Sequence, residues 1–78
     1  MEKELLDNID KLHTTALGIE RVKKNLALDV ADVVAWCRKK TENADRVIRE
    51  GKNWYVYVDN AILTINARSF TIITARKR

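Results

Sequence analysis

The last third of the chain contains three consecutive segments with the composition of β-strands. Segments 54–59, 61–68 and 70–77 are rich in β-branched and aromatic residues, and none of them contains glycine or proline. Asp59-Asn60 separates the first two segments, and both residue types tolerate the positive φ angles of a two-residue hairpin turn. The sequence therefore predicts an antiparallel sheet here, and helices must come from the residues that precede it.

Apolar residues at helical spacing predict two helices near the N-terminus. Leu5, Leu6, Ile9 and Leu12 indicate an amphipathic helix over 2–12. A second helix is expected over 15–25, and its N-cap is expected to be one of the adjacent threonines, Thr14 or Thr15.

A third helix is predicted over 30–41, with Asp29 as its N-cap. Apolar residues then recur at i, i+3, i+4 and i+7, and a basic triplet falls in the last turns, where cations complement the helix dipole. Residues 42–45 are expected to connect this helix to a short edge strand over 46–50. The predicted fold class is α+β, with two to three helices packed on one face of a three- or four-stranded antiparallel sheet, in one domain over 1–78.

The strand register sorts the side chains onto two faces. A two-residue turn at Asp59-Asn60 makes every inward cross-strand pair apolar. The helix-packed face is then expected to carry Trp54, Val56, Val58, Leu63, Ile65, Ala67, Phe70 and Ile72. The opposite face would carry Tyr55, Tyr57, Ile62, Thr64, Asn66, Thr71, Ile73 and Ala75. A one-residue bulge near Ser69 would instead turn Thr74 and Arg76 toward the tyrosines.

Composition excludes several kinds of site. The chain has 78 residues, a net charge of +4, one cysteine and one histidine. Cys37 has no partner for an intrachain disulfide, and the usual zinc and Ser-His-Asp sets need more residues than Cys37 and His13 supply. We therefore expect no metal and no cofactor. Because no apolar run spans a membrane and no signal-like segment begins the chain, we expect no membrane association and a cytoplasmic location.

Several motifs resemble one family of short bacterial proteins. They are His13-Thr14-Thr15, 18–21 (GIER), Asp32-Val33-Val34 with Trp36-Cys37, 51–56 (GKNWYV), and 71–75 (TIITA). These motifs are spread over nearly the whole chain. Because the family is known only as a domain of unknown function, the resemblance implies no activity.

A more distant resemblance is to the barnase, colicin and RelE group of ribonuclease toxins. It is based on the order of the elements and on the Thr-Ile-Ile-Thr-Ala strand. The resemblance implies His13 as a catalytic acid or base, with Thr74 and Arg76 as catalytic groups on the last strand. It also implies that Arg21 and Arg68 hold phosphate. It leads us to expect a histidine where this chain has Arg76, and an arginine does not shuttle protons near neutral pH.

Nucleic-acid binding, most readily of RNA, is the function that the sequence favours. Tyr55 and Tyr57 are two residues apart on one strand, which is the spacing for stacking successive bases. Asn66 and Thr71 would add polar contacts, and Arg21 and Arg68 would contact phosphate. The sequence leaves open whether the chain is also an enzyme like the ribonuclease toxins, because it shows no clear pair of base and nucleophile.

Each of these residues also has a plainly structural explanation. His13 could cap or pack at a helix junction, the tyrosines could be packing residues, and the polar strand residues could be ordinary cross-strand pairs. Two other functions also remain open. One is a protein-binding module, such as an inhibitor from a mobile element or a toxin–antitoxin component. The other is a homodimer that packs through the second sheet face.

Overall fold

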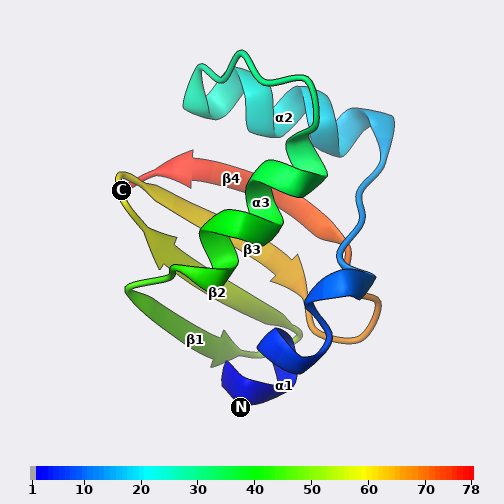
Figure 1. Cartoon of the computed structure of the whole chain (residues 1–78), viewed down its shortest axis with the longest axis vertical. Helices are drawn as coiled ribbons and strands as arrows, with labels where there is room; N and C mark the ends of the chain where they lie inside the picture. The colour runs from blue at the N-terminus through cyan, green and yellow to red at the C-terminus, as the bar shows by residue number, and fades with distance from the viewer. Residues whose placement is uncertain (1) are drawn as a thin grey trace.

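The computed structural model describes residues 2–78 and shows N-terminal helices packing on a four-stranded antiparallel sheet (Figure 1). This α+β architecture confirms the predicted fold class. The sheet order is β1-β2-β3-β4, so every strand pairs with its neighbour in sequence. The elements are α1 (Glu2–Asp7), a 3-10 helix η1 (Ile9–Lys11), α2 (Ala16–Leu26), α3 (Val33–Glu42), β1 (Arg46–Glu50), β2 (Asn53–Val58), β3 (Ala61–Asn66) and β4 (Ile72–Lys77).

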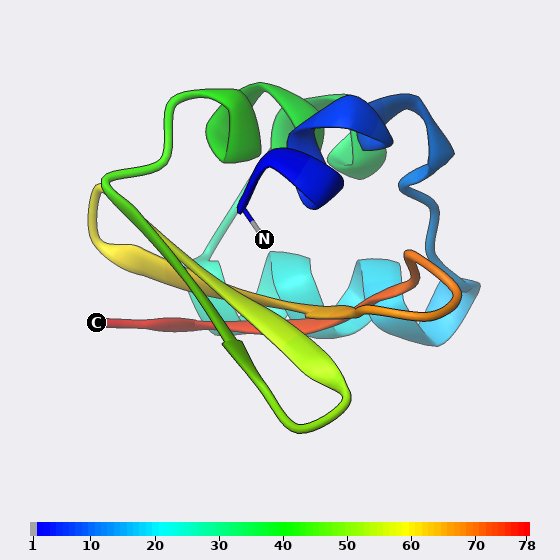
Figure 2. The same cartoon turned by 90° about the horizontal axis from the view of Figure 1, so that it is seen from below.

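The helices are not all on the same side of the sheet. Figure 2 shows α1 and α3 over one face, whereas α2 lies beside β4 and covers that edge. Within residues 2–78, no helix lies over the opposite face, which we call the outer face. From the register, its side chains on the four strands are Arg46, Ile48, Tyr55, Tyr57, Ile62, Thr64, Thr74 and Arg76.

One hydrophobic core joins the helices to the sheet. Trp54 is its largest fully buried side chain, and its ring centroid lies 5.4 Å from that of Phe70. The predicted helix-packed residues are found in or against this core. Its fully buried members are Leu5, Leu12, Val22, Val33, Cys37, Trp54, Val56, Val58, Leu63, Ile65, Ile72 and Ala75.

The first predicted helix is interrupted at Asn8. The Asn8 side-chain amide donates to the Glu4 carbonyl oxygen at 2.8 Å, which offers that carbonyl an alternative to the next helical bond. The prediction of one helix over 2–12 is therefore wrong in its continuity. The chain forms α1, then the separate turn η1, and Leu5 and Leu12 both reach the core.

The N-cap of α2 agrees with the sequence prediction, whereas the N-cap of α3 does not. Thr15 caps α2 as predicted, since its hydroxyl accepts from the Gly18 N–H at 3.1 Å. Asp32, and not Asp29, caps α3, since its carboxylate accepts from the Ala35 N–H at 3.0 Å. The predicted start of the third helix was wrong by one turn because Val30 packs on the core without being helical.

The β2–β3 hairpin follows the predicted register. Strand β1 has the predicted bounds, and β2 pairs with β3 through Val58↔Ala61, Val56↔Leu63 and Trp54↔Ile65. The turn between them places Asp59 at φ 52°, in the left-handed region that aspartate tolerates.

The last strand takes the bulged alternative. Ile72 pairs with Ile65, but the register then shifts, and Thr74 and Ala75 pair with Thr64 and Leu63. Without the shift, Thr74 and Arg76 would point under the helices; with it, Ala75 takes an inward position and is completely buried. The assignment of Ala75 to the outer face was therefore wrong, and the bulge lies at Ile73 instead of near Ser69.

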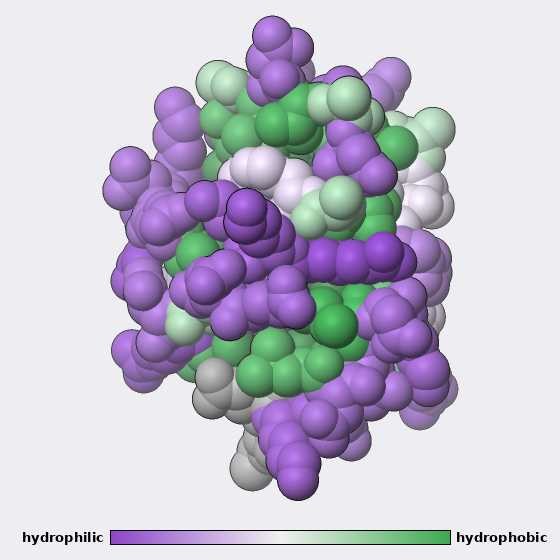
Figure 3. Space-filling view, viewed as in Figure 1, coloured by the Kyte–Doolittle hydropathy of each residue, from purple (hydrophilic) through white to green (hydrophobic). Residues whose placement is uncertain are grey.

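The helix-covered side is mostly polar at its surface. Figure 3 shows a band of polar side chains across α3, with smaller apolar areas on either side of it. Across the described residues, no helix is both long enough and apolar enough to cross a membrane.

Candidate functional site

The outer face is built from rows of side chains that run across all four strands. The first row is Arg46, Tyr57, Ile62 and Arg76, and the second is Ile48, Tyr55, Thr64 and Thr74. Beyond the second row, Asn53 pairs with Asn66, whose backbone N–H donates to the Thr71 carbonyl oxygen at 2.8 Å. The strands therefore bring six of the predicted site residues onto one surface: Tyr55, Tyr57, Asn66, Thr71, Thr74 and Arg76.

The two tyrosines lie in the middle of this surface. Both are half-buried and belong to β2, an interior strand, so their rings are supported by neighbouring strands on both sides. The Arg78 guanidinium lies 5.4 Å from the centroid of the Tyr57 ring, within cation–π range. Tyr57 thus has a basic group against its ring, whereas Tyr55 has the aliphatic and hydroxyl side chains of Ile48 and Thr64 as its cross-strand neighbours.

Arginines mark both edges of the first row. Arg46 on β1 and Arg76 on β4 are exposed, with two strands between them. Three inter-strand spacings separate their Cα atoms by about 14 Å. The ion pairs among the described side chains are Lys40–Asp59 and Arg78–Asp45, so Arg46 and Arg76 are engaged in neither. These two charges are available to an anion that lies across the tyrosine row.

Helix α2 extends the basic character past the edge of β4. A depression of about 490 Å³ lies between the helix and Thr74, and its lining includes Arg21 and Lys24 as well as Glu20. The Asn25 side chain donates to the Ala75 carbonyl oxygen at 2.9 Å, which fixes the helix against this strand. Arg21 therefore lies beside the predicted Thr74, although the two come from distant parts of the chain.

His13 belongs to a hydrogen-bonded chain at the far end of the same surface. Its Nε2 lies 3.1 Å from the Thr71 hydroxyl, and that hydroxyl lies 2.7 Å from the Ser69 hydroxyl. Ser69 in turn donates to the Asn66 side-chain oxygen at 3.1 Å, while His13 Nδ1 lies 2.9 Å from the Lys11 carbonyl oxygen. These contacts join the segment before α2 to the turn between β3 and β4.

Asn66 also has a structural role, because its side chain stabilises a turn. Its side-chain oxygen also accepts from the backbone N–H groups of Arg68 and Ser69, at 3.0 and 2.9 Å, and so forms the turn between β3 and β4. Arg68 is exposed in that turn, beyond the end of the tyrosine rows.

The residues implied as catalytic do not form one cluster. His13 contacts Thr71, whereas Arg76 lies five residues further along the strand, a distance of about 16 Å in extended chain. Thr74 lies between them, with its hydroxyl 3.4 Å from the Asn25 side-chain nitrogen. A single reacting group could not contact both His13 and Arg76.

No metal or thiol chemistry is evident at the site. Among the described residues, no group of three or more His, Cys, Asp or Glu side chains is arranged to hold a metal ion. Cys37 is fully buried in the core, and this burial raises the pKa of its thiol to about 12. The thiol is therefore protonated at neutral pH and is not a nucleophile.

Sequence reasoning missed several residues of this surface. Arg46 was recognised as part of an edge strand, and its position opposite Tyr57 follows directly from the register. Ser69 follows Asn66 at the spacing of an Asx turn, a signal that was available. Asn25 and Arg78 act through contacts with residues far away in sequence, at Ala75 and Tyr57, and no local pattern indicates them.

The family described as "Protein of unknown function (DUF3781)" matches residues 6–76. The chain belongs to this family, in agreement with the first resemblance. No curated protein and no solved structure matches the chain, so these comparisons give no support to the resemblance to ribonuclease toxins.

Proposed function

We propose that this DUF3781 protein binds single-stranded nucleic acid, preferentially RNA, on the outer face of its sheet. The observation that carries the proposal is the first transverse row, in which Tyr57 lies between arginines at both sheet edges, with Tyr55 beside it. Flat aromatic side chains stack on bases of any sequence, and basic groups at the rim contact the phosphates.

The two tyrosines are expected to contribute unequally. Tyr55 carries no cation on its ring in the described contacts, whereas a base must share or displace Arg78 to stack on Tyr57. A base stacked on an aromatic ring contributes about 1–3 kcal/mol. Tyr55→Ala should therefore weaken binding by about 5- to 150-fold, and Tyr57→Ala by less.

The preference for RNA is based on the row that contains Tyr55. The hydroxyl groups of Thr64 and Thr74 lie in this row, on the two strands beyond Tyr55, and can hydrogen-bond a ribose 2′-hydroxyl. The proposal is for binding and not for cleavage, because His13 and Arg76 are too far apart to act on one phosphate.

Fluorescence anisotropy with a labelled oligouridine of about 10 nucleotides tests the proposal. Four basic contacts, from the arginines at the two sheet edges and from Arg21 and Lys24 of α2, predict a slope of log K against log salt of about −3. Arg76→Gln should reduce the magnitude of that slope by about 0.7. Lys39→Gln is the matched control, because Lys39 is exposed on α3, which covers the other face.

The proposal fails if affinity does not depend on salt, or if Tyr55→Ala binds as tightly as the original chain. An equal affinity for oligodeoxyuridine would contradict the preference for RNA alone. Light scattering on the same samples tests whether a second copy of the chain, instead of nucleic acid, covers the outer face. A stable dimer that Tyr55→Ala dissociates, with no oligonucleotide bound, would assign the outer face to self-association.

A further inference from the structure

A second site lies on the helix side of the sheet, at the end of the β2–β3 hairpin. A cavity of about 450 Å³ opens there, within the range of small-molecule pockets. Its walls come from four separate parts of the chain: the end of α2, α3, the hairpin and the C-terminal residues. The lining is Leu26, Leu28, Trp36, Val58, Asp59, Asn60, Ala61, Lys77 and Arg78.

The cavity combines an apolar interior with a basic rim. Leu26, Leu28 and Trp36 are only partly buried although they pack against the core, so part of their apolar surface faces this space. Lys77 lies opposite Ala61 in the register and therefore on the helix side, away from Arg76 and the outer face. The cavity therefore opens on the opposite side of the sheet from the outer face, and the residue common to both is Arg78, whose guanidinium contacts the Tyr57 ring.

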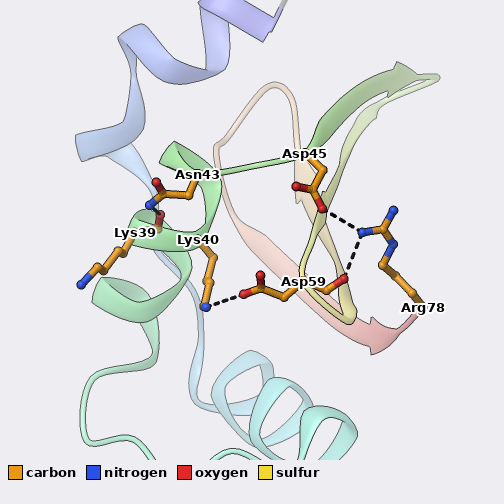
Figure 4. Close-up of polar contacts among 6 residues, drawn as sticks. All are labelled: Lys39, Lys40, Asn43, Asp45, Asp59 and Arg78. Atoms are coloured by element: carbon orange, nitrogen blue, oxygen red, sulfur yellow. Dashed lines mark hydrogen bonds and ion pairs between the residues drawn. The ribbon is translucent and has the colours of Figure 1, made fainter.

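Ion pairs hold the charged groups at the rim of the cavity in place, but Lys77 takes part in neither ion pair of the described side chains. Figure 4 shows Asp59 between Lys40 and Arg78: its carboxylate pairs with Lys40 at 2.6 Å, and its carbonyl oxygen accepts from Arg78 at 3.0 Å. Arg78 also pairs with the carboxylate of Asp45 at 3.0 Å. Each of these two carboxylates already has its own cation, whereas Lys77 takes part in neither ion pair formed by the described side chains. The Lys40 ammonium, 5.6 Å from the Trp36 ring centroid, adds further positive potential.

We propose that this cavity binds a small aromatic carboxylate. The flat apolar body would lie against Trp36 and the two leucines, and the carboxylate would pair with Lys77 at the rim. A monoanion fits because Lys77 is the one basic residue of the described cavity lining that takes part in neither ion pair. A charged hydrogen bond to a carboxylate is also stronger than one to a neutral oxygen. A neutral molecule of the same shape would gain the apolar contacts but would leave Lys77 unpaired.

The experiment is a titration of the ¹⁵N-labelled chain with 2-naphthoate, followed by two-dimensional NMR. The two tryptophans are natural reporters, because Trp36 lines the cavity and Trp54 is buried in the core. Trp36→Phe assigns their indole signals. The expected result is a shift of the Trp36 indole signal and of the Asn60 and Ala61 amides, with the Trp54 indole unchanged.

Charge is tested with 2-naphthamide, which has the same ring and no charge. We expect the amide to bind at least about fivefold more weakly than 2-naphthoate. Lys77→Gln should remove this difference, whereas Lys39→Gln, an exposed lysine of α3 outside the cavity lining, should keep it. The inference is overturned by equal binding of amide and carboxylate, by shifts centred on Tyr55 and Thr64, or by no shift at about 5 mM probe.

Discussion

The contact between α2 and the edge of β4 gives a quantitative test of the fold around the outer face. Gly18 lies on the buried side of α2, and a Cβ atom placed there would lie only 2.0 Å from the Thr14 hydroxyl oxygen and 3.2 Å from the Ile72 carbonyl oxygen. The Thr14 hydroxyl donates to that same carbonyl at 2.7 Å. Gly18→Ala must therefore displace the Thr14 side chain and break this hydrogen bond.

The expected stability change is the sum of opposing effects. Alanine gains about 1 kcal/mol over glycine as a helix residue. Loss of the hydrogen bond costs about 1 kcal/mol, and leaving the part-buried Ile72 carbonyl oxygen without its partner raises the cost to about 1–3 kcal/mol. The tight 3.2 Å approach to the backbone adds to this cost. We expect Gly18→Ala to lower the free energy of unfolding by about 1–2 kcal/mol, or Tm by roughly 5–15 °C.

A double-mutant cycle isolates the cause. Thr14→Ala removes the hydroxyl oxygen with which the new Cβ would clash, so adding Gly18→Ala to it should be neutral or stabilising by up to about 1 kcal/mol. Urea unfolding followed by tryptophan fluorescence measures all four proteins. If Gly18→Ala alone stabilises the chain by the full helix-propensity gain, then α2 does not approach β4 as described, and the reasoning is refuted.

Two further predictions concern the helices of the core side. Burial raises the Cys37 pKa to about 12 from a reference of 9.0, so the folded chain holds this proton more tightly than the unfolded chain does. The contribution of this proton to the free energy of unfolding is therefore complete below pH 9 and falls by about 1.4 kcal/mol per pH unit above it. Urea unfolding at several pH values should show this fall, and Cys37→Ala should reduce it. Asp32→Ala should cost about 1 kcal/mol through loss of the α3 cap, whereas Asp29→Ala should change stability little, and equal losses in thermal unfolding would contradict the observed helix start.

The sequence predicted the register of the β2–β3 hairpin because every relevant signal was local. Asp59-Asn60 specifies a two-residue turn, and a shift of one residue would have exposed Trp54, Val56 and Val58 together. The predicted start of α3 was wrong because aspartates suited to capping occur one turn apart, at 29 and 32, and the local pattern favoured Asp29. Only the packing of Val30 on the core, outside the helix, decides between them.

The bulge in β4 could have been inferred from the inward positions of this strand, because the shifted register leaves Lys77, at the exposed end of the strand, as its inward charge. A regular strand would have pointed Arg76 under the helices, where an unpaired charge is costly, whereas the shifted strand buries Ala75 and leaves Arg76 in water. The position of α2 has no such local signal. The polar groups that hold it, Thr14 and Asn25, bond to β4 carbonyl oxygens that lie 58 and 50 residues away in the sequence.

The position of α2 beside the sheet explains why one face is left open. Side chains from α2 and the residue before the cap satisfy the carbonyl oxygens of Ile72 and Ala75, so this part of the β4 edge is closed to further strands. A helix used at the edge is not available to cover the outer face. The same arrangement puts Arg21 and Lys24 next to Thr74, which extends the basic rim beyond Arg76. The protected edge and the enlarged basic surface therefore both result from the packing of α2 against β4. A variant that detached α2 should lose both together.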